Sequence, residues 1–314
     1  MTLSRWLRHE TILAVLTNIA RIVLAILSDK FFTTENLLNQ GRLMSEVGLV
    51  ALAMTFVIVT GGIDLSVGSI LGLTAILLGV FWKNVGLPLP AAIVLAVACG
   101  TFAGWVNGFI ITRFRVPPLI ATLATLALYR GLAEGISEAR SVRGYPEWFF
   151  FFGQGEVLGV PFQLWILGIA TVIAAVILGL TPFGRATYAI GANETAARFS
   201  GIRVNATKLW IYAAAGFLSA LAAVIFVSRV TTTRSDMGTG LELDVITGVV
   251  LGGTSIFGGR GTVIGTVLGL ILIQALKNGL ALSGVKGDGT IVVIGLVLIG
   301  AILAGALFDK NRGG

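Results

Sequence analysis

The chain has 314 residues, of which 56% are hydrophobic and 12% are charged, and this composition excludes an ordinary soluble protein. The net charge of +7 could indicate nucleic-acid binding in a soluble protein, but here the basic residues lie at the ends of apolar runs, where they orient membrane spans. We therefore expect no nucleic-acid partner. A single cysteine, Cys99, and a single histidine, His9, exclude an intrachain disulfide and a metal site that needs several such ligands.

Apolar runs long enough to cross roughly 30 Å of hydrocarbon recur along the chain. They do not alternate polar and apolar residues, as the strands of a membrane β-barrel do. The sequence thus predicts an all-α, polytopic membrane helical bundle that forms one transmembrane domain over residues 1–314. About ten transmembrane helices are expected, at 11–28, 43–60, 65–82, 90–112, 116–135, 162–181, 209–228, 243–258, 262–280 and 290–308.

The charges between these spans indicate the orientation of the bundle. An even number of spans places both termini on one side of the membrane. If that side is the cytoplasm, the inner segments carry eleven Lys or Arg residues and the outer loops carry eight. This excess agrees in sign with the positive-inside rule. We expect both termini in the cytoplasm.

Two glycine-rich stretches interrupt the predicted helices. In the first, Gly61 and Gly62 weaken the helix, and Asp64, followed by Ser66, is placed to cap a new one. A chain reversal here exposes backbone groups, which is tolerated at membrane depth only inside protein or beside water. Asp64 is interpreted either as a locally satisfied helix cap or as a direct contact to a transported substrate or a gate.

The second stretch, 252–261, has the same character and includes Gly252, Gly253 and Thr254. Paired interruptions in the two halves of a membrane protein indicate a translocation site between structural repeats, so we predict that 61–64 and 252–261 line a pathway. Asn107 precedes a glycine, as does Asn278 in the second half, which is consistent with an internal repeat. Asn107 itself is either an interhelical hydrogen-bonding residue or a substrate ligand.

The longest loop on the predicted outer side of the membrane, 136–161, contains Tyr145, Trp148 and four consecutive phenylalanines, 149–152. Aromatic rings are favoured at the membrane interface. The loop is therefore interpreted as an interfacial anchor or as a docking surface for an external partner.

A polar segment, 182–208, separates two runs without charged residues and must lie outside the membrane. Asn193 is a candidate N-cap, Glu194 occupies the first turn and Gly201 is a candidate stop, which predicts a helix of about two turns. Arg198 follows Glu194 at the i,i+4 spacing, and Ala196 and Ala197 leave a small surface. Because so short a helix is unstable alone, it is either an ordinary loop or an element held by a partner.

The sequence lacks a motif that would supply energy for transport. No GxxxxGK[ST] phosphate-binding loop is present, so the chain does not bind ATP by that route. The central parts of the spans offer little besides Asp64 for a proton relay of the kind found in secondary transporters. Three functions of the chain remain open. It is a permease driven by an ATPase on another chain, a self-sufficient secondary sugar transporter, or a non-transporting scaffold.

Four ordered motifs carry a family resemblance. Residues 194–197 and 201–202, Glu-Thr-Ala-Ala followed by Gly-Ile, resemble the cytoplasmic loop of permease subunits in binding-protein-dependent ABC importers. The segments 61–69, 104–126, 181–202 and 249–266 are similar to the branch that imports ribose, xylose, arabinose, rhamnose and autoinducer-2. The likeness covers roughly residues 40–310.

This resemblance implies a permease subunit in the inner membrane of a bacterial cell, with a cytoplasmic coupling loop at 182–208. Its coupling residues would be Asn193, Glu194, Ala196, Ala197, Arg198 and Gly201. The partners implied are an ABC ATPase subunit, a second permease copy or paralogue, a periplasmic sugar-binding protein and the lipid bilayer. The chain itself would be no enzyme and would hold no cofactor, because the partner ATPase would bind ATP and magnesium.

Overall fold

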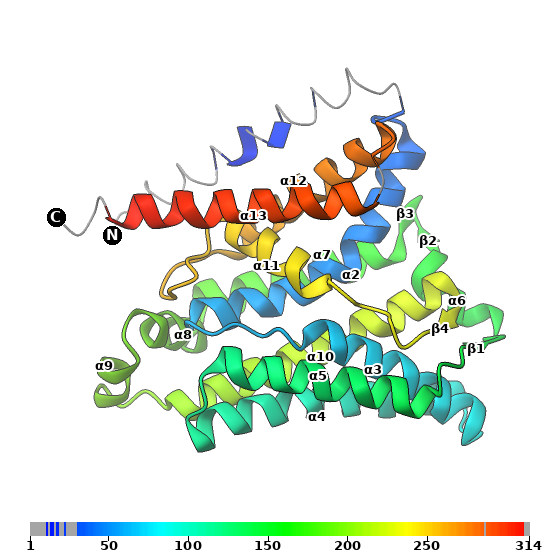
Figure 1. Cartoon of the computed structure of the whole chain (residues 1–314), viewed down its shortest axis with the longest axis horizontal. Coiled ribbons are helices and arrows are strands. Elements are labelled where there is room, and N and C mark those ends of the chain that lie inside the picture. The colour runs from blue at the N-terminus through cyan, green and yellow to red at the C-terminus, as the bar shows by residue number, and fades with distance from the viewer. Residues whose placement is uncertain are drawn as a thin grey trace.

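The computed structural model describes residues 30–285 and 287–310, together with residues 11, 13–15, 17, 18 and 22. Most of the first predicted span, 11–28, lies outside the described residues. The described chain is a bundle of long helices with two short strand pairs at one end (Figure 1). The predicted all-α membrane bundle is confirmed.

The helices follow one another through the whole described chain. They are α2 Thr34–Val59, α3 Val67–Gly79, the π-helical turn η1 Val80–Asn84, α4 Leu89–Phe114, α5 Pro118–Ser137, α6 Glu147–Gln154, α7 Phe162–Leu180, α8 Pro182–Ala192, α9 Glu194–Phe199, α10 Val204–Val230, α11 Leu241–Leu251, α12 Val263–Leu282 and α13 Gly287–Lys310. Strand β1 Val142–Arg143 pairs antiparallel with β4 Thr232–Thr233, and β2 Glu156–Val157 pairs antiparallel with β3 Val160–Pro161.

Several helices begin at residues with local capping chemistry. Thr33, Thr181 and Thr262 precede α2, α8 and α12, and each hydroxyl accepts a hydrogen bond from a backbone amide three residues later. Helices α4, α5 and α8 carry proline in the first turn, where the fixed φ of proline suits a helix start. The helix starts are therefore encoded by adjacent residues.

Seven helices in the described part of the chain are long and apolar enough to cross a membrane. The predicted span 243–258 is wrong, because α11 ends at Leu251 after 11 residues. A helix of that length reaches about 16 Å, roughly half of the hydrocarbon thickness. Gly253, at φ +88°, turns the backbone out of the helix even though the apolar sequence continues to Phe257.

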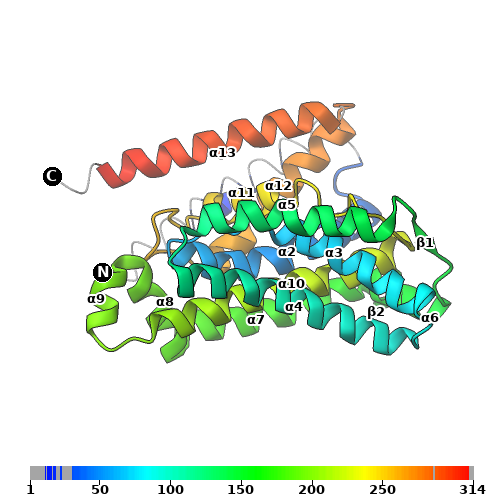
Figure 2. The same cartoon turned by 60° about the horizontal axis from the view of Figure 1, so that its bottom comes forward.

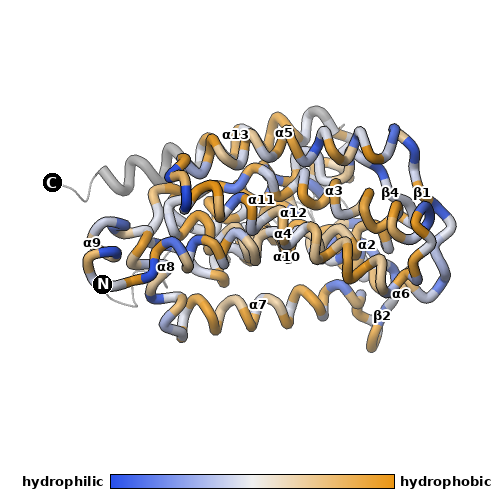
Figure 3. The backbone as a smooth tube through the Cα atoms, turned by 90° about the horizontal axis from the view of Figure 1, so that it is seen from below, coloured by the Kyte–Doolittle hydropathy of each residue, from blue (hydrophilic) through white to orange (hydrophobic). Residues whose placement is uncertain are grey.

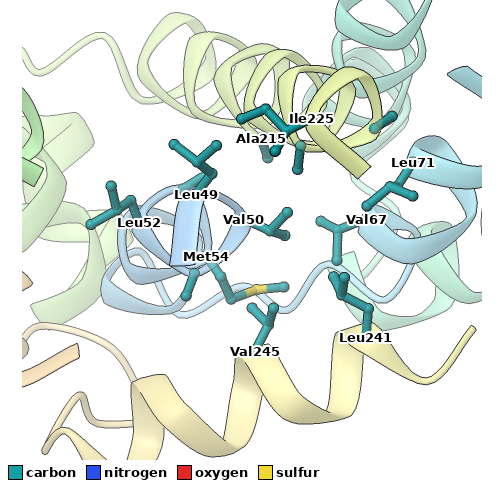
Figure 4. Close-up of a cluster of buried hydrophobic side chains, with 14 of the residues drawn as sticks. Leu49, Val50, Leu52, Met54, Val67, Leu71, Ala215, Ile225, Leu241 and Val245 are labelled. Atoms are coloured by element: carbon teal, nitrogen blue, oxygen red, sulfur yellow. The ribbon is translucent and has the colours of Figure 1, made fainter. Parts of the chain in front are cut away.

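The core lies between α2, α10 and α11 (Figure 4). Leu49 and Val50 of α2 are fully buried and pack toward α10, where Ala215 is also fully buried. Val245 extends the same cluster from α11. Helices α2 and α10 therefore form the centre around which the other helices are arranged.

The helices on either side of this centre are arranged as an inverted repeat. Helix α10 packs on α3 and α4, and α2 packs on α11 and α12. Each central helix is followed by a largely non-helical segment, 60–66 after α2 and 231–240 after α10. The next helices, α3 and α11, begin side by side and run toward opposite ends of the bundle (Figure 1). The segment that corresponds to 60–66 is therefore 231–240, and the predicted pairing with 252–261 needs correction.

The two repeats meet at the starts of α3 and α11. A β-carbon at Gly68 would lie 2.3 Å from the carbonyl oxygen of Gly238, so only glycine permits this approach. Arg130 of α5 donates to the carbonyl oxygens of Ser235 and Met237, the latter at 2.9 Å. Arg130 also reaches the carbonyl oxygen of Gly68 at 3.4 Å. A side chain of the first repeat thus donates hydrogen bonds to backbone carbonyl oxygens of the second repeat.

The two ends of the bundle differ. Helices α8 and α9 project at one end, and α6 with the strand pairs lies at the other (Figure 2). Apolar residues dominate the long helices, and hydrophilic residues gather at both ends (Figure 3). In the aromatic loop, Tyr145 and Phe149 are buried, whereas Trp148 is about half exposed. The loop therefore packs partly on the protein and partly faces outward.

Candidate functional site

The predicted coupling element is a helical hairpin of α8 and α9. The side-chain oxygen of Asn193 accepts the amide of Ala196 at 2.9 Å, which confirms the predicted N-cap. Gly201 has φ +81°, and the amide of Ile202 donates to the carbonyl of Ala197 at 3.1 Å, so α9 ends with a glycine turn as predicted. Helix α9 has six residues.

Charged side chains tie α9 to the start of α10. Glu194 accepts a hydrogen bond from Arg198 at 3.1 Å and from Lys208 at 2.6 Å. Arg198 also donates to Asn205 at 3.1 Å. Partial burial alone would raise the pKa of Glu194, but the hydrogen bonds and charges of Lys208 and Arg198 together hold that pKa below its ordinary value. The carboxylate therefore fixes the orientation of α9.

The two faces of α9 have different surroundings. Ala197 is 4% exposed and packs against Ile190 and Val204, so its side chain supports the hairpin from inside. This placement corrects the prediction that Ala197 offers a surface to a partner. Asn193, Glu194, Ala196, Arg198 and Gly201 are exposed. Phe199 is 89% exposed.

Phe199 is a residue that the sequence reasoning missed. It ends a short polar helix that projects from one end of the bundle (Figure 3). Phenylalanine is among the residue types enriched at protein interfaces, so this ring is a candidate contact for a partner. A large apolar residue within an otherwise polar segment was the available signal.

Three predicted pathway residues form one buried network. Asp64 accepts hydrogen bonds from the amide of Ser66 at 2.9 Å and from its hydroxyl at 2.6 Å. Asn107 of α4 donates to the same hydroxyl at 2.7 Å. Asp64, Ser66 and Asn107 are each fully buried. The structure thus brings these three residues together as a support for the start of α3.

The first break turns at Gly61, where φ is +77°. Gly62 is buried, and a β-carbon there would lie 2.6 Å from the hydroxyl oxygen of Tyr212 on α10. The second Asp64 carboxylate oxygen is buried and has no hydrogen-bond partner among the described residues. Polar side chains of α4 and α10, Asn107 and Tyr212, therefore converge on this break.

The second glycine-rich segment is a compact turn between α11 and α12. Gly252 packs on the backbone of Gly265, and a β-carbon at Gly252 would lie 2.3 Å from the Gly265 carbonyl oxygen. Gly253 takes a positive φ, and Thr254 is 2% exposed and donates its amide to Val249 at 3.2 Å. Gly252, Gly253 and Thr254 therefore shape the turn that ends α11.

The two glycine-rich segments meet at the end of the bundle that carries α8. The amide of Gly259 donates to the carbonyl oxygen of Val59 at 2.8 Å. Gly191 of α8 lies over this bond, because a β-carbon there would be 1.8 Å from the Val59 oxygen and 2.4 Å from the Gly259 nitrogen. The hydroxyl of Tyr188 donates to the Gly261 carbonyl at 2.7 Å. Helix α8 is thus in direct contact with both segments.

The comparison with known proteins decides the family. Residues 36–303 match the family model described as "Branched-chain amino acid transport system / permease component". The chain belongs to this permease family. The match contains the α8–α9 hairpin and both glycine-rich segments, and it confirms the predicted resemblance to a permease subunit.

Relatives of this permease align over most of its length. The "Ribose import permease protein RbsC" of Bacillus subtilis (strain 168) is 45% identical over 93% of this chain and 89% of its own length. The protein of the same description from Escherichia coli (strain K12) is 41% identical over 98% and 95%. The "Autoinducer 2 import system permease protein LsrD" of Escherichia coli O9:H4 (strain HS) is 40% identical over 77% and 75%. No solved structure gives a significant match.

Proposed function

We propose that this permease imports a monosaccharide or a similar hydroxyl-rich solute and that a separate ABC ATPase drives it. The family description refers to branched-chain amino acids, but the relatives that align over nearly the whole chain are described as ribose import permeases. The length and identity of these alignments favour a sugar over an amino acid. The partner ATPase binds ATP and magnesium, and this chain needs no cofactor.

The observation that carries the coupling role is the exposed α9 helix. Its outer face presents Glu194, Arg198 and the 89% exposed Phe199 beyond the apolar bundle. A projection of six residues is too short to be a stable helix alone, and a cleft in an ATPase would supply packing for its outer face. Because α8 contacts both glycine-rich segments, a displacement of α9 reaches the ends of α2 and α11 through a continuous backbone path.

The positions of the remaining partners follow from the orientation of the bundle in the membrane. The α9 end faces the cytoplasm of a bacterial cell, and the end with α6 faces the periplasm. A sugar-binding protein delivers the solute at the α6 end. A second copy or a close paralogue completes the transporter, so that two bundles enclose one pathway, and gating residues include Asp64, Asn107 and Thr254.

Reconstitution tests the proposed function. Proteoliposomes that contain the permease, its ATPase and its sugar-binding protein should accumulate D-ribose only when ATP is supplied. L-leucine should neither enter nor compete. Uptake of ribose by the permease alone under an ion gradient would show a secondary carrier, and ATP-driven uptake of leucine would assign the substrate to the amino-acid class. Either result would contradict the proposal.

A further inference from the structure

A cavity of about 680 Å³ lies in the half of the bundle opposite α9. Its walls come from α2, the end of α10, the segment 231–240, α11 and α12. These elements approach one another on the side of the bundle that carries β4 (Figure 1). The volume lies within the range of about 300–1,000 Å³ that is usual for small-molecule sites.

Amide side chains form part of the wall. Gln274 of α12 donates to the side-chain oxygen of Gln40 on α2 at 2.5 Å. One turn away, Asn278 and Asn36 exchange two hydrogen bonds, at 2.9 and 3.0 Å. Asn36 lies outside the wall, and both of its donor hydrogens are used, by Phe31 and by Asn278. An amide carries two donor hydrogens and an acceptor oxygen, so Gln40, Gln274 and Asn278 of the cavity wall keep hydrogen-bonding capacity beyond these contacts. Such groups can recognise a ligand hydroxyl, which both donates and accepts.

The charges around the cavity are paired with one another. Glu46 forms a two-pronged ion pair with Arg229, at 2.7 and 3.0 Å. Asp244 of α11 pairs with Lys277 of α12, and Asp236 pairs with Arg234. Every carboxylate in the cavity wall thus has a cation beside it. A charged or zwitterionic ligand would have to break one of these pairs, whereas a neutral ligand would not.

We propose that this cavity is a binding subsite for a neutral, hydroxyl-rich solute within a single permease subunit. The inference rests on the proposed function, because it assigns a place to the sugar after its release at the periplasmic end. Leu241 and Asp244, at the start of α11, contribute to the wall of the subsite. A solute in the cavity would therefore contact α11, and the C-terminal end of α11 leads into the 252–261 turn.

The test uses the purified permease–ATPase complex in lipid nanodiscs without the sugar-binding protein. Equilibrium binding of radiolabelled D-ribose is measured for the natural chain and for Gln274→Met, which keeps the side-chain length and removes the amide. We expect ribose binding to weaken about three- to tenfold, as for the loss of one or two neutral hydrogen bonds. The control is Asn84→Leu, because Asn84 carries an exposed amide on η1 outside the cavity wall.

A second variant does not depend on the amide. Thr239 is exposed on the segment 231–240 and lines the cavity, so Thr239→Trp should fill the space without disturbing the core. It should abolish ribose binding while the permease still inserts and co-purifies with its ATPase. Unchanged ribose binding in both variants would overturn the subsite, as would displacement of ribose by L-leucine.

Failure of the subsite differs from failure of the proposed function. If the natural complex transports ribose with its binding protein but binds none without it, the subsite is wrong and the proposed function stands. If the complete system transports no sugar, the proposed function falls as well.

Discussion

The amide of Gly259 donates to the carbonyl oxygen of Val59 at 2.8 Å, and this bond joins the end of α2 to the turn between α11 and α12. The two residues are separated by most of the chain, yet both lie directly under Gly191 of α8. The glycine-rich segments of the two halves are therefore joined to each other and to the hairpin that carries α9. We infer that this junction transmits movement of α9 to the bundle.

The first prediction concerns Gly191→Ala. A β-carbon at this position would lie 1.8 Å from the Val59 oxygen, so α8 must move away from the junction. Overpacking of this kind typically costs about 1–3 kcal/mol. We expect ATP-driven uptake to fall at least tenfold, while the ATPase remains bound, because the outer face of α9 is unchanged. Uptake and ATPase co-purification are measured on the same preparation.

The control for this variant is Gly168→Ala. Gly168 lies in α7, and an added β-carbon there meets no atom within 4 Å. This control should transport normally. Equal uptake by Gly191→Ala and Gly168→Ala would show that the junction does not transmit movement.

The second prediction concerns Phe199→Asp. The phenyl ring is 89% exposed, so the substitution leaves the fold of the permease intact and removes an apolar anchor. We expect at least a tenfold loss of ATPase co-purification, which corresponds to about 1.4 kcal/mol. Leu158→Asp is the matched control, because Leu158 is 88% exposed and follows β2, whose strand pair lies at the end of the bundle opposite α9 (Figure 1). Retention of the ATPase by Phe199→Asp would exclude an anchoring role for the ring.

The parts of the fold that the sequence predicted correctly depend on neighbouring residues. The cap at Asn193 and the turn at Gly201 need only the chemistry of one side chain and one permissive backbone. The break after Val59 follows for the same reason, because two glycines and an aspartate interrupt the helix within a few residues. Local rules were therefore sufficient for these features.

The parts that failed depend on contacts between distant segments. Hydropathy alone extended the predicted span to residue 258, although the break marked by Gly252 and Gly253 is where α11 ends, at Leu251. Glycines mark both 61–64 and 252–261, but the inverted packing that makes 231–240 the counterpart of 60–66 has no local signal. Ala197 faces inward because Ile190 and Val204 lie beside it, and neither belongs to α9.

The third prediction concerns the buried network at the start of α3. Asn107 donates to the Ser66 hydroxyl at 2.7 Å, and both residues are fully buried. Asn107→Leu removes this donor while it keeps a similar volume, so we expect the free energy of unfolding to fall by about 1–3 kcal/mol. The melting temperature in detergent measures the effect. Asn84→Leu, at an exposed asparagine of η1, is the control, and an equal melting temperature for the two variants would refute the structural role of Asn107.

The last prediction concerns pH and the orientation of α9. The pKa of Glu194 in the folded chain lies below its ordinary value, because its bonds to Lys208 and Arg198 outweigh the effect of partial burial. The carboxylate therefore stabilises the hairpin fully at pH values above its unfolded pKa of about 4.3. This contribution is lost as the pH falls through the lower folded pKa. We expect α9 to stay ordered at neutral and mildly acidic pH and to loosen only at pH values below the ordinary pKa of a glutamate.

A nitroxide label at Thr195→Cys, in a Cys99→Ser background, reports this transition through its mobility. Thr195 is exposed beside Glu194, so the label does not enter the packed face of α9. Glu194→Gln removes the charge and should give a mobile label at neutral pH already, with no further change on acidification. If the label is equally immobile at neutral pH with and without the Glu194→Gln substitution, Ala197 packing alone orients α9, and the ion pairs have no role in coupling.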